Sequence, residues 1–327
     1  MATPENLFYV TNFFGGGVGV VKADRTMIVT TSLERDRAKT LGREVEVVQT
    51  KSYVALWDTV QKNLESGVCV VDDDGAVRKN KRFVMRDHMF LEARRKKDEE
   101  ELRRIKKASA ILDGIFEVLE KEIEVGRTER QLAAEILLNA TREGATPSGF
   151  QGSLSPTILA SGENGAFPHA EVTDRRIKSG DLVVADLTFR YEGYNSDATR
   201  TFAVKRTSAD MKKKYDALLE AQLRGVKLSR EGVMCGDVHE GVASVLRKHS
   251  LEKYFVHSTG HGVGIDAHEL PNLRRGNDTR LKRNDVVTVE PGLYFAGKFG
   301  IRIEDTVVVG DGPVILNRYT KELVTVG

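Results

Sequence analysis

Hydrophobic residues recur along this chain with two different spacings, and each spacing predicts a different kind of element. In the first part, short apolar or alternating runs predict β-strands over residues 18–22, 27–31, 45–49 and 68–72, and a helical pattern covers 53–65. Strands that alternate with helices in this way are typical of a small α/β domain. We therefore expect a first domain over residues 1–88.

A long helical pattern over residues 90–124 opens the second part. Residues 94–107 form a dense charge run, which by itself would suit a tract that binds a polyanion. Apolar residues continue at helical spacing, so we interpret the charges as the solvated face of an amphipathic helix; these residues are Leu102, Ile105, Leu112, Ile115, Phe116, Leu119 and Ile123. Further helices are expected over 128–141, which begins with a capping box, and over 209–227 and 237–248. The second domain is expected to span residues 89–327.

Residues 182–202 predict a β-hairpin that carries two acids on one face, Asp186 and Asp197. Both arms are rich in β-branched and aromatic residues, and a Tyr191-Glu192-Gly193 corner supplies the turn. Placed symmetrically about that corner, the acids are expected to lie opposite each other with Cβ atoms about 5 Å apart. Two carboxylates so close repel each other, and a divalent cation would remove the repulsion. For the hairpin alone, an exposed pair of acids in water remains an equal alternative.

Three downstream residues favour the cation. His261 lies in a glycine-rich segment, residues 256–264, where the backbone can approach a ligand closely. Glu290 follows a strand-like run and precedes Pro291, which stops the strand at that acid. Glu304 lies in a second strand-like run, 301–309, where a two-residue period places it on the same face as Arg302. Four carboxylates and one imidazole therefore stand at strand ends or in tight loops.

Composition excludes several classes of partner. The 327 residues are 40% hydrophobic, enough for a sizeable core, and 50 basic against 48 acidic residues leave a net charge of +2. Nothing in this balance indicates a nucleic acid or an anionic membrane as a partner. The two cysteines, Cys69 and Cys235, stand among small or apolar residues and fit a reducing compartment. No apolar run is long enough to span a bilayer and the first residues lack the basic start of a signal peptide, so we expect a cytoplasmic protein.

The acids and the histidine occur in motifs that resemble those of the pita-bread metallopeptidases (family M24), which include methionine aminopeptidases, Xaa-Pro aminopeptidases and Xaa-Pro dipeptidases (prolidases). Asp186 and Asp197 fit D-x(10)-D, His261 fits GHGxG, Glu290 fits EPG and Glu304 fits RxED. The resemblance implies an α+β pita-bread catalytic domain, with a mixed antiparallel sheet backed by helices. It also implies that the small α/β domain before it is shortened, without its first helix and strand.

The same resemblance implies a dinuclear metal site. In this reading Asp197 and Glu304 bridge two divalent ions, Asp186 completes the coordination of one, and His261 with Glu290 completes that of the other. The family favours Mn²⁺ or Co²⁺, and an oxygen-rich donor set with one imidazole also accepts Fe²⁺ or Zn²⁺. Glu290 is expected to take a proton from the attacking water and to pass it to the leaving amine.

Further residues keep the family's spacing around the substrate. His169 resembles the histidine that contacts the substrate, and His268 the one that moves protons or holds the scissile carbonyl. His257 resembles the histidine that contacts residues beyond the cleaved bond in Xaa-Pro peptidases, although a lone histidine is more often structural. Arg302 is expected to orient Glu304 or to balance its charge, and Tyr294 either binds substrate or simply packs as an aromatic after a turn.

Substrate choice follows from the domain order and these residues, which resemble the proline-specific members. We expect a dipeptidase that cleaves Xaa-Pro dipeptides, with peptides bearing proline at the second position as substrates and a homodimer as the assembly. In several dipeptidases an arginine that binds the free carboxylate follows His-Glu-x-Pro, and here that position is Asn272, with Arg274 and Arg275 just beyond. An Xaa-Pro aminopeptidase is the close alternative. A methionine aminopeptidase-like enzyme and a metal-free pita-bread binding module also stay open.

Overall fold

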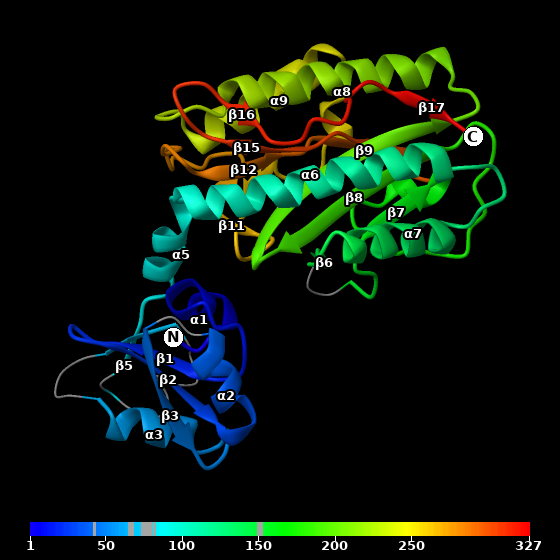
Figure 1. Ribbon diagram of the computed structural model, residues 1–327. Helices are drawn as coiled ribbons and strands as arrows, with labels where there is room; N and C mark the ends of the chain where they lie inside the picture. Colours follow the sequence, from blue (N-terminus) through cyan, green and yellow to red (C-terminus); the bar gives the residue numbers. More distant parts are fainter. Residues whose placement is uncertain (42–43, 65–68, 73–80, 82, 149–152) are drawn as a thin grey trace. The chain divides into compact units, whose positions relative to one another are not determined.

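The computed structural model describes residues 1–41, 44–64, 69–72, 81, 83–148 and 153–327. The chain divides into two compact units, Met1–Arg94 and Arg95–Gly327 (Figure 1). The division falls a few residues beyond the predicted boundary, inside helix α5 (Asp87–Arg95). That residues 1–88 and 89–327 form two independent domains stays a prediction.

The first unit alternates strands and helices. Its elements are α1 (Pro4–Thr11), β1 (Val18–Val21), β2 (Thr26–Thr31), α2 (Ser32–Leu41), β3 (Val45–Thr50), α3 (Leu56–Lys62), β4 (Cys69–Val71) and β5 (Phe83–Met85). They form a three-stranded sheet in the order β1-β2-β3 and a separate parallel pair β4-β5. The predicted strands and the predicted helix are confirmed apart from their ends, of which residues 65 and 68 lie outside the described residues. The core contains Trp57, which contacts Phe83.

The long helix predicted over residues 90–124 is wrong as a single element. The structure contains two helices here, α5 and α6 (Glu99–Glu122). Asp98 caps α6 by accepting a hydrogen bond from the backbone N–H of Glu101, whose side chain accepts one from the backbone N–H of Asp98. An N-cap residue adopts an extended backbone, so this capping box starts a new helix inside the continuous charge run. The predicted capping box at Thr128, which opens α7 (Glu129–Arg142), is confirmed.

The predicted hairpin consists of β8 (Leu182–Tyr191) and β9 (Tyr194–Val204). Its register differs from the prediction by two residues. Asp186 pairs with Thr199 and Thr188 pairs with Asp197, so the two acids are diagonal and not directly opposite. The reason is the turn: Glu192 and Gly193 both have positive φ, so they form a two-residue connection and Tyr191 pairs with Tyr194. A shift of two keeps both acids on the same face.

Helices cover one face of the sheet that contains this hairpin. The sheet also includes β6 (Thr146–Pro147), β7 (Ile158–Ser161) and β17 (Val324–Val326), which runs parallel to β9. Alternate residues of β8, such as Val183 and Leu187, pack with residues of α6 and α7 in one apolar core. Figure 1 shows α6 lying across β8 and β9. Because side chains alternate along a strand, Asp186 and Asp197 project from the opposite face.

A second sheet carries or adjoins the other three predicted ligands, His261, Glu290 and Glu304. Its strands, in order, are β11 (Glu269–Leu273), β10 (Gly260–Gly262), β12 (Val286–Val289), β15 (Asp305–Val308) and β16 (Val314–Ile315). The antiparallel helices α8 (Ala209–Leu228) and α9 (Cys235–Lys248) pack against it, as Figure 1 shows. The predicted helices over 209–227 and 237–248 are confirmed, and their observed bounds are slightly longer.

The strand expected over residues 301–309 is also wrong as a single element. Residues up to Arg302 belong to β14 (Phe299–Arg302), which pairs with β13 (Gly292–Phe295) as a separate hairpin, and Asp305 begins β15 in the second sheet. Ile303 and Glu304 lie in the break between these strands. All residues from 299 to 309 are buried, so burial gives no sign that the chain changes sheets at the break. Among the described residues, no helix combines the length and apolar character needed to cross a bilayer.

A buried ion pair joins the two sheets. Arg200 of β9 donates to Asp305 across 2.9 Å, and the two side chains are 1% and 0% exposed. Arg200 also donates to the backbone carbonyl of Glu304 at 2.6 Å. Asp305 accepts further hydrogen bonds from Lys321 and Gln222. The pair therefore fixes β9, which bears Asp197, against Asp305, which directly follows Glu304.

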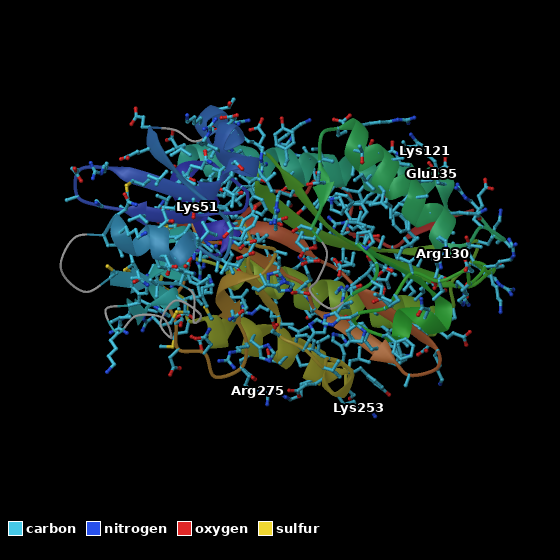
Figure 2. All side chains as sticks on the ribbon, turned by 90° about the horizontal axis from the view of Figure 1, so that it is seen from below. Lys51, Lys121, Arg130, Glu135, Lys253 and Arg275 are labelled. Atoms are coloured by element: carbon cyan, nitrogen blue, oxygen red, sulfur yellow. The ribbon has the colours of Figure 1, made fainter. Side chains whose placement is uncertain are left out.

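We predict that Arg200→Met lowers the free energy of unfolding by about 3 kcal/mol, because it leaves the Asp305 carboxylate buried without its principal cation. Urea denaturation followed by circular dichroism measures this. The matched control is Arg130→Met, since the side chains of the Arg130–Asp174 pair are 62% and 75% exposed (Arg130 is labelled in Figure 2). A loss in the control as large as that in Arg200→Met would show that the buried pair has no special role.

Candidate metal centre

Eight of the ten predicted site residues line a single cavity. They come from separate elements: β8 and β9 contribute the two aspartates, β10 contributes His261, and the others stand at strand ends or in loops. The cavity has a volume of about 60 Å³. The predicted residues in its wall are His169, Asp186, Asp197, His261, His268, Glu290, Arg302 and Glu304.

The two remaining predicted residues, His257 and Tyr294, lie behind this wall. The hydroxyl of Tyr294 is 2.9 Å from Nε2 of His257, and it accepts a hydrogen bond of 2.9 Å from Arg302. Arg302 is itself part of the cavity wall, so a chain of contacts connects His257 to the cavity. Burial raises the pKa of Tyr294 to about 12, so its hydroxyl keeps its proton near neutral pH.

Three of these side chains form a compact set of donors. Asp197, His261 and Glu304 each present one ligand atom, and these atoms lie within 4.8 Å of one another. All three residues are buried. The Nδ1 of His261 lies 3.0 Å from the carbonyl of Gly262, a contact that places the proton on Nδ1 in the neutral ring and leaves Nε2 to face the acids. A neutral imidazole held in this way is the usual histidine ligand of a metal.

An unpaired polar atom supports a metal at this position. Oδ1 of Asp197 is buried and has no hydrogen-bond partner among the described groups. Buried oxygens without partners are rare because each loses its contact with water, and a cation would satisfy this one. Asp186 and Glu290 flank the donor set: Asp186 contacts Arg302, and Glu290 approaches Nε2 of His261 to 3.3 Å. An oxygen-rich set with one imidazole is typical of a divalent metal site.

Crowding of carboxylates shifts their protonation. Burial raises the pKa of Asp197, and the negative charge of Asp186 raises it further. Burial likewise raises the pKa of Glu304, and Asp197 adds to the shift. Each of these acids therefore holds a proton more tightly than an exposed carboxylate does, until a cation compensates the charge. Clustered acids whose pKa values are raised in this way are typical of a functional site.

His261 and Glu290 both favour their charged forms, because they pair with each other. Burial alone would lower the pKa of His261, but Glu290 and Asp197 outweigh it and raise the value to about 9. Burial alone would raise the pKa of Glu290, but the hydrogen bond and charge of His261 bring it down to about 2. In the absence of metal, the protonated imidazole is therefore the cation that balances Glu290.

Hydroxyl groups that the sequence analysis missed hold the acids in place. Thr199 donates to Glu304 at 2.7 Å and accepts from Nε of Arg302 at 3.2 Å. Thr288 lies two residues before Glu290 and donates to it at 3.3 Å. The period of a strand could have revealed both threonines, because each lies two positions from a predicted ligand and therefore on the same face.

Comparison with known proteins agrees with this site. The family model described as metallopeptidase family M24 matches residues 103–311, and the chain belongs to that family. Over 99% of its length the chain is 32% identical to an Xaa-Pro dipeptidase from Pyrococcus furiosus, of which the match covers 94%. The family resemblance inferred from the motifs is thereby confirmed, and the protein is a metallopeptidase.

Solved structures extend the similarity to the whole fold. The chain superimposes on the prolidase from Pyrococcus furiosus with a TM-score of 0.89 at 32% identity, covering 98% of this chain and 95% of that one. It matches an X-Pro aminopeptidase from Thermotoga maritima equally well, with a TM-score of 0.89 at 29% identity and coverage of 99% and 95%. The predicted α+β pita-bread fold is confirmed. The role of each site residue stays a prediction.

We predict that binding of Mn²⁺ releases protons and strengthens as the pH rises toward about 9. The metal needs deprotonated ligands, whereas the pKa of His261, about 9, keeps a proton on its imidazole below that pH, and the raised pKa values of Asp197 and Glu304 make these acids hold their protons more tightly. Isothermal titration calorimetry in two buffers of different ionisation enthalpy measures the proton release. The number of protons released should fall in His261→Gln. It should stay unchanged in His249→Gln, because His249 follows α9 and pairs with Glu220 of α8. Binding that is independent of pH would contradict the assignment.

Proposed function

We propose that this protein hydrolyses the Xaa-Pro bond of dipeptides and that two divalent ions, preferably Mn²⁺, are its cofactors. The observation that carries the proposal is the donor set of Asp197, His261 and Glu304, with its unpaired carboxylate oxygen, in a member of a metallopeptidase family. The name of the Pyrococcus furiosus relative, Xaa-Pro dipeptidase, supports the substrate class. A homodimer and a cytoplasmic location are further proposals, supported by the family resemblance and by two free cysteines.

Amide hydrolysis needs a nucleophile, a proton acceptor and a proton donor for the leaving amine. Bound divalent ions supply the first of these by lowering the pKa of a water molecule. Glu290 is the residue that we assign to the proton transfer. Its carboxylate faces the cavity beside His261, with Oε1 3.3 Å from Nε2 of that ring. It can therefore accept a proton and then release it to the amine.

We assign the histidines around the cavity to binding of the substrate. Desolvation by the surrounding protein lowers the pKa of His268 to about 4, and His261 contributes to the shift. A neutral imidazole can donate one hydrogen bond to a peptide carbonyl without attracting the metal's acidic ligands. His169 stands in the same cavity wall, and we assign it to contact with the substrate. Tyr294 and His257 support Arg302 from behind.

An Xaa-Pro aminopeptidase is the second candidate. The chain matches the X-Pro aminopeptidase from Thermotoga maritima as closely in fold as it matches the prolidase. Asn272, which lies in β11, occupies the position of the arginine that clamps a free dipeptide carboxylate in several relatives. An asparagine carries no charge and cannot form that ion pair. Longer peptides, which lack a carboxylate there, would not need it.

We predict cleavage of an Xaa-Pro dipeptide in the presence of Mn²⁺ and loss of that activity on addition of a chelator. Hydrolysis of this dipeptide, an Xaa-Pro-Xaa tripeptide and a Met-Ala peptide should be measured side by side. Preference for the tripeptide would replace the dipeptidase with the aminopeptidase. Cleavage of the Met-Ala peptide alone would refute proline specificity, and no cleavage with any metal would favour a binding module.

We predict that Asp197→Asn lowers kcat at least about 100-fold, because the variant loses the charge that holds the metal and with it several kcal/mol of transition-state stabilisation. Metal content by mass spectrometry should fall in parallel. Asp174→Asn is the matched control, since Asp174 pairs with Arg130 on the surface. Full activity in Asp197→Asn would mean that this carboxylate is not a metal ligand.

A further inference from the structure

The residues between α5 and α6 contain a lysine with an unusual position. The side chain of Lys97 is only 1% exposed, and its Nζ lies 2.9 Å from Oε2 of Glu269, whose side chain is 2% exposed. Lysine is almost never fully buried unless it is paired. Both residues belong to the unit Arg95–Gly327, and neither is among the predicted site residues.

The backbone of Lys97 is fixed on both sides. Its N–H donates to the carbonyl of Asn284 at 3.1 Å, and its own carbonyl accepts from the side chain of Asn284 at 3.1 Å. The next residue, Asp98, is the N-cap of α6. The ammonium group therefore projects from a rigid part of the fold, so it can serve as a fixed anchor for whatever it binds.

Glu269 connects this anchor to the residues that carry His268. We call residues 264–269 the His268 loop. Glu269 directly follows His268, and its second carboxylate oxygen, Oε1, accepts a hydrogen bond of 3.1 Å from the backbone N–H of Asp266. A Cβ on Gly264 would lie 2.5 Å from Oε2 of Glu269 and 2.9 Å from Nζ of Lys97. Only glycine at that position leaves room for the ion pair under the loop.

Residues of the β8–β9 hairpin hold the first half of the His268 loop. Asn195 of β9 donates to the carbonyls of Gly264 and Ile265 at 3.0 and 2.7 Å, and Arg190 of β8 donates to the carbonyl of Ile265 at 3.1 Å. The second half is held by Glu269 through its hydrogen bond from the backbone N–H of Asp266. This half sets the position of the His268 imidazole, whose ring centroid is 4.0 Å from that of His261.

We propose that Lys97 is a positioning residue that acts through Glu269: the buried ion pair fixes the His268 loop and places the His268 imidazole beside the donor set. The inference rests on the proposed function, because it takes His268 as the group that meets the substrate. Lys97 itself does not line the cavity, so its effect on the reaction passes through the loop.

The test is a double-mutant cycle in the metal-loaded enzyme. Lys97→Met should lower kcat on the Xaa-Pro dipeptide about 10- to 100-fold and change KM less than about threefold. In a His268→Gln background the same change should lower kcat less than about threefold, because the imidazole that it misplaces is already gone. An equal loss in both backgrounds would refute the proposal, as would full activity of Lys97→Met.

Two variants separate positioning from general damage. Arg95→Met breaks the buried pair of Arg95 with Asp285, whose side chains are 2% and 0% exposed, two residues before Lys97. It should lower the melting temperature and leave kcat within about threefold of the parent. If Lys97→Met alone fails to fold, Lys97→Met/Glu269→Gln removes both charges and should show the same loss of kcat. A comparable loss in Arg95→Met would overturn the proposal.

A second readout does not depend on catalysis. The chain has seven histidines, so ring signals of ¹³C-labelled histidine can be resolved by NMR, and the His268 signal is assigned by its absence in His268→Gln. Lys97→Met should shift or broaden this signal, and Arg95→Met should not. An unchanged signal in Lys97→Met refutes the positioning role whatever the enzyme cleaves. Inactivity of the parent on every peptide refutes the proposed function and leaves the NMR test intact.

Discussion

The crowding of negative charge in one buried cavity constrains the rest of the catalytic unit. Asp186, Asp197, Glu290 and Glu304 face the same small space, and among the described residues Arg302 and a protonated His261 lie there to balance their charge. Such a cluster persists only if the surrounding structure holds it together, because separation of the acids would relieve their repulsion. The threonine hydrogen bonds, the Arg200–Asp305 pair and the two covered sheets provide that restraint.

Much of this arrangement could be predicted from local patterns. The two-residue period of a strand placed Asp186 and Asp197 on one face, and the face survived an error in register because the shift was even. The register itself depends on the backbone angles of Glu192 and Gly193. A Glu-Gly pair signals a corner, but it does not determine how many residues the connection uses.

Other features depend on tertiary contacts that no local pattern contains. Residues 299–309 are buried without interruption, yet the chain leaves one hairpin and enters another sheet at Glu304. The sequence did contain the signal that separates α5 from α6, since Asp98 and Glu101 have the spacing of a capping box. The pairing of Lys97 with Glu269 joins residues far apart in the chain, so only the folded structure reveals it.

The parallel pairing of β17 with β9 has a consequence for the order of events during synthesis. β9 carries Asp197, but its outer neighbour is the strand Val324–Val326, and Arg200 donates to the carbonyls of Tyr319 and Thr320. A ribosome must therefore finish residues up to 326 before β9 acquires its second neighbour. Until then Arg200, which fixes β9 against Asp305, also lacks its two acceptors at Tyr319 and Thr320, so the hairpin that bears the acids is synthesised well before the residues that complete its surroundings. Long-range contacts of this kind form late and slowly.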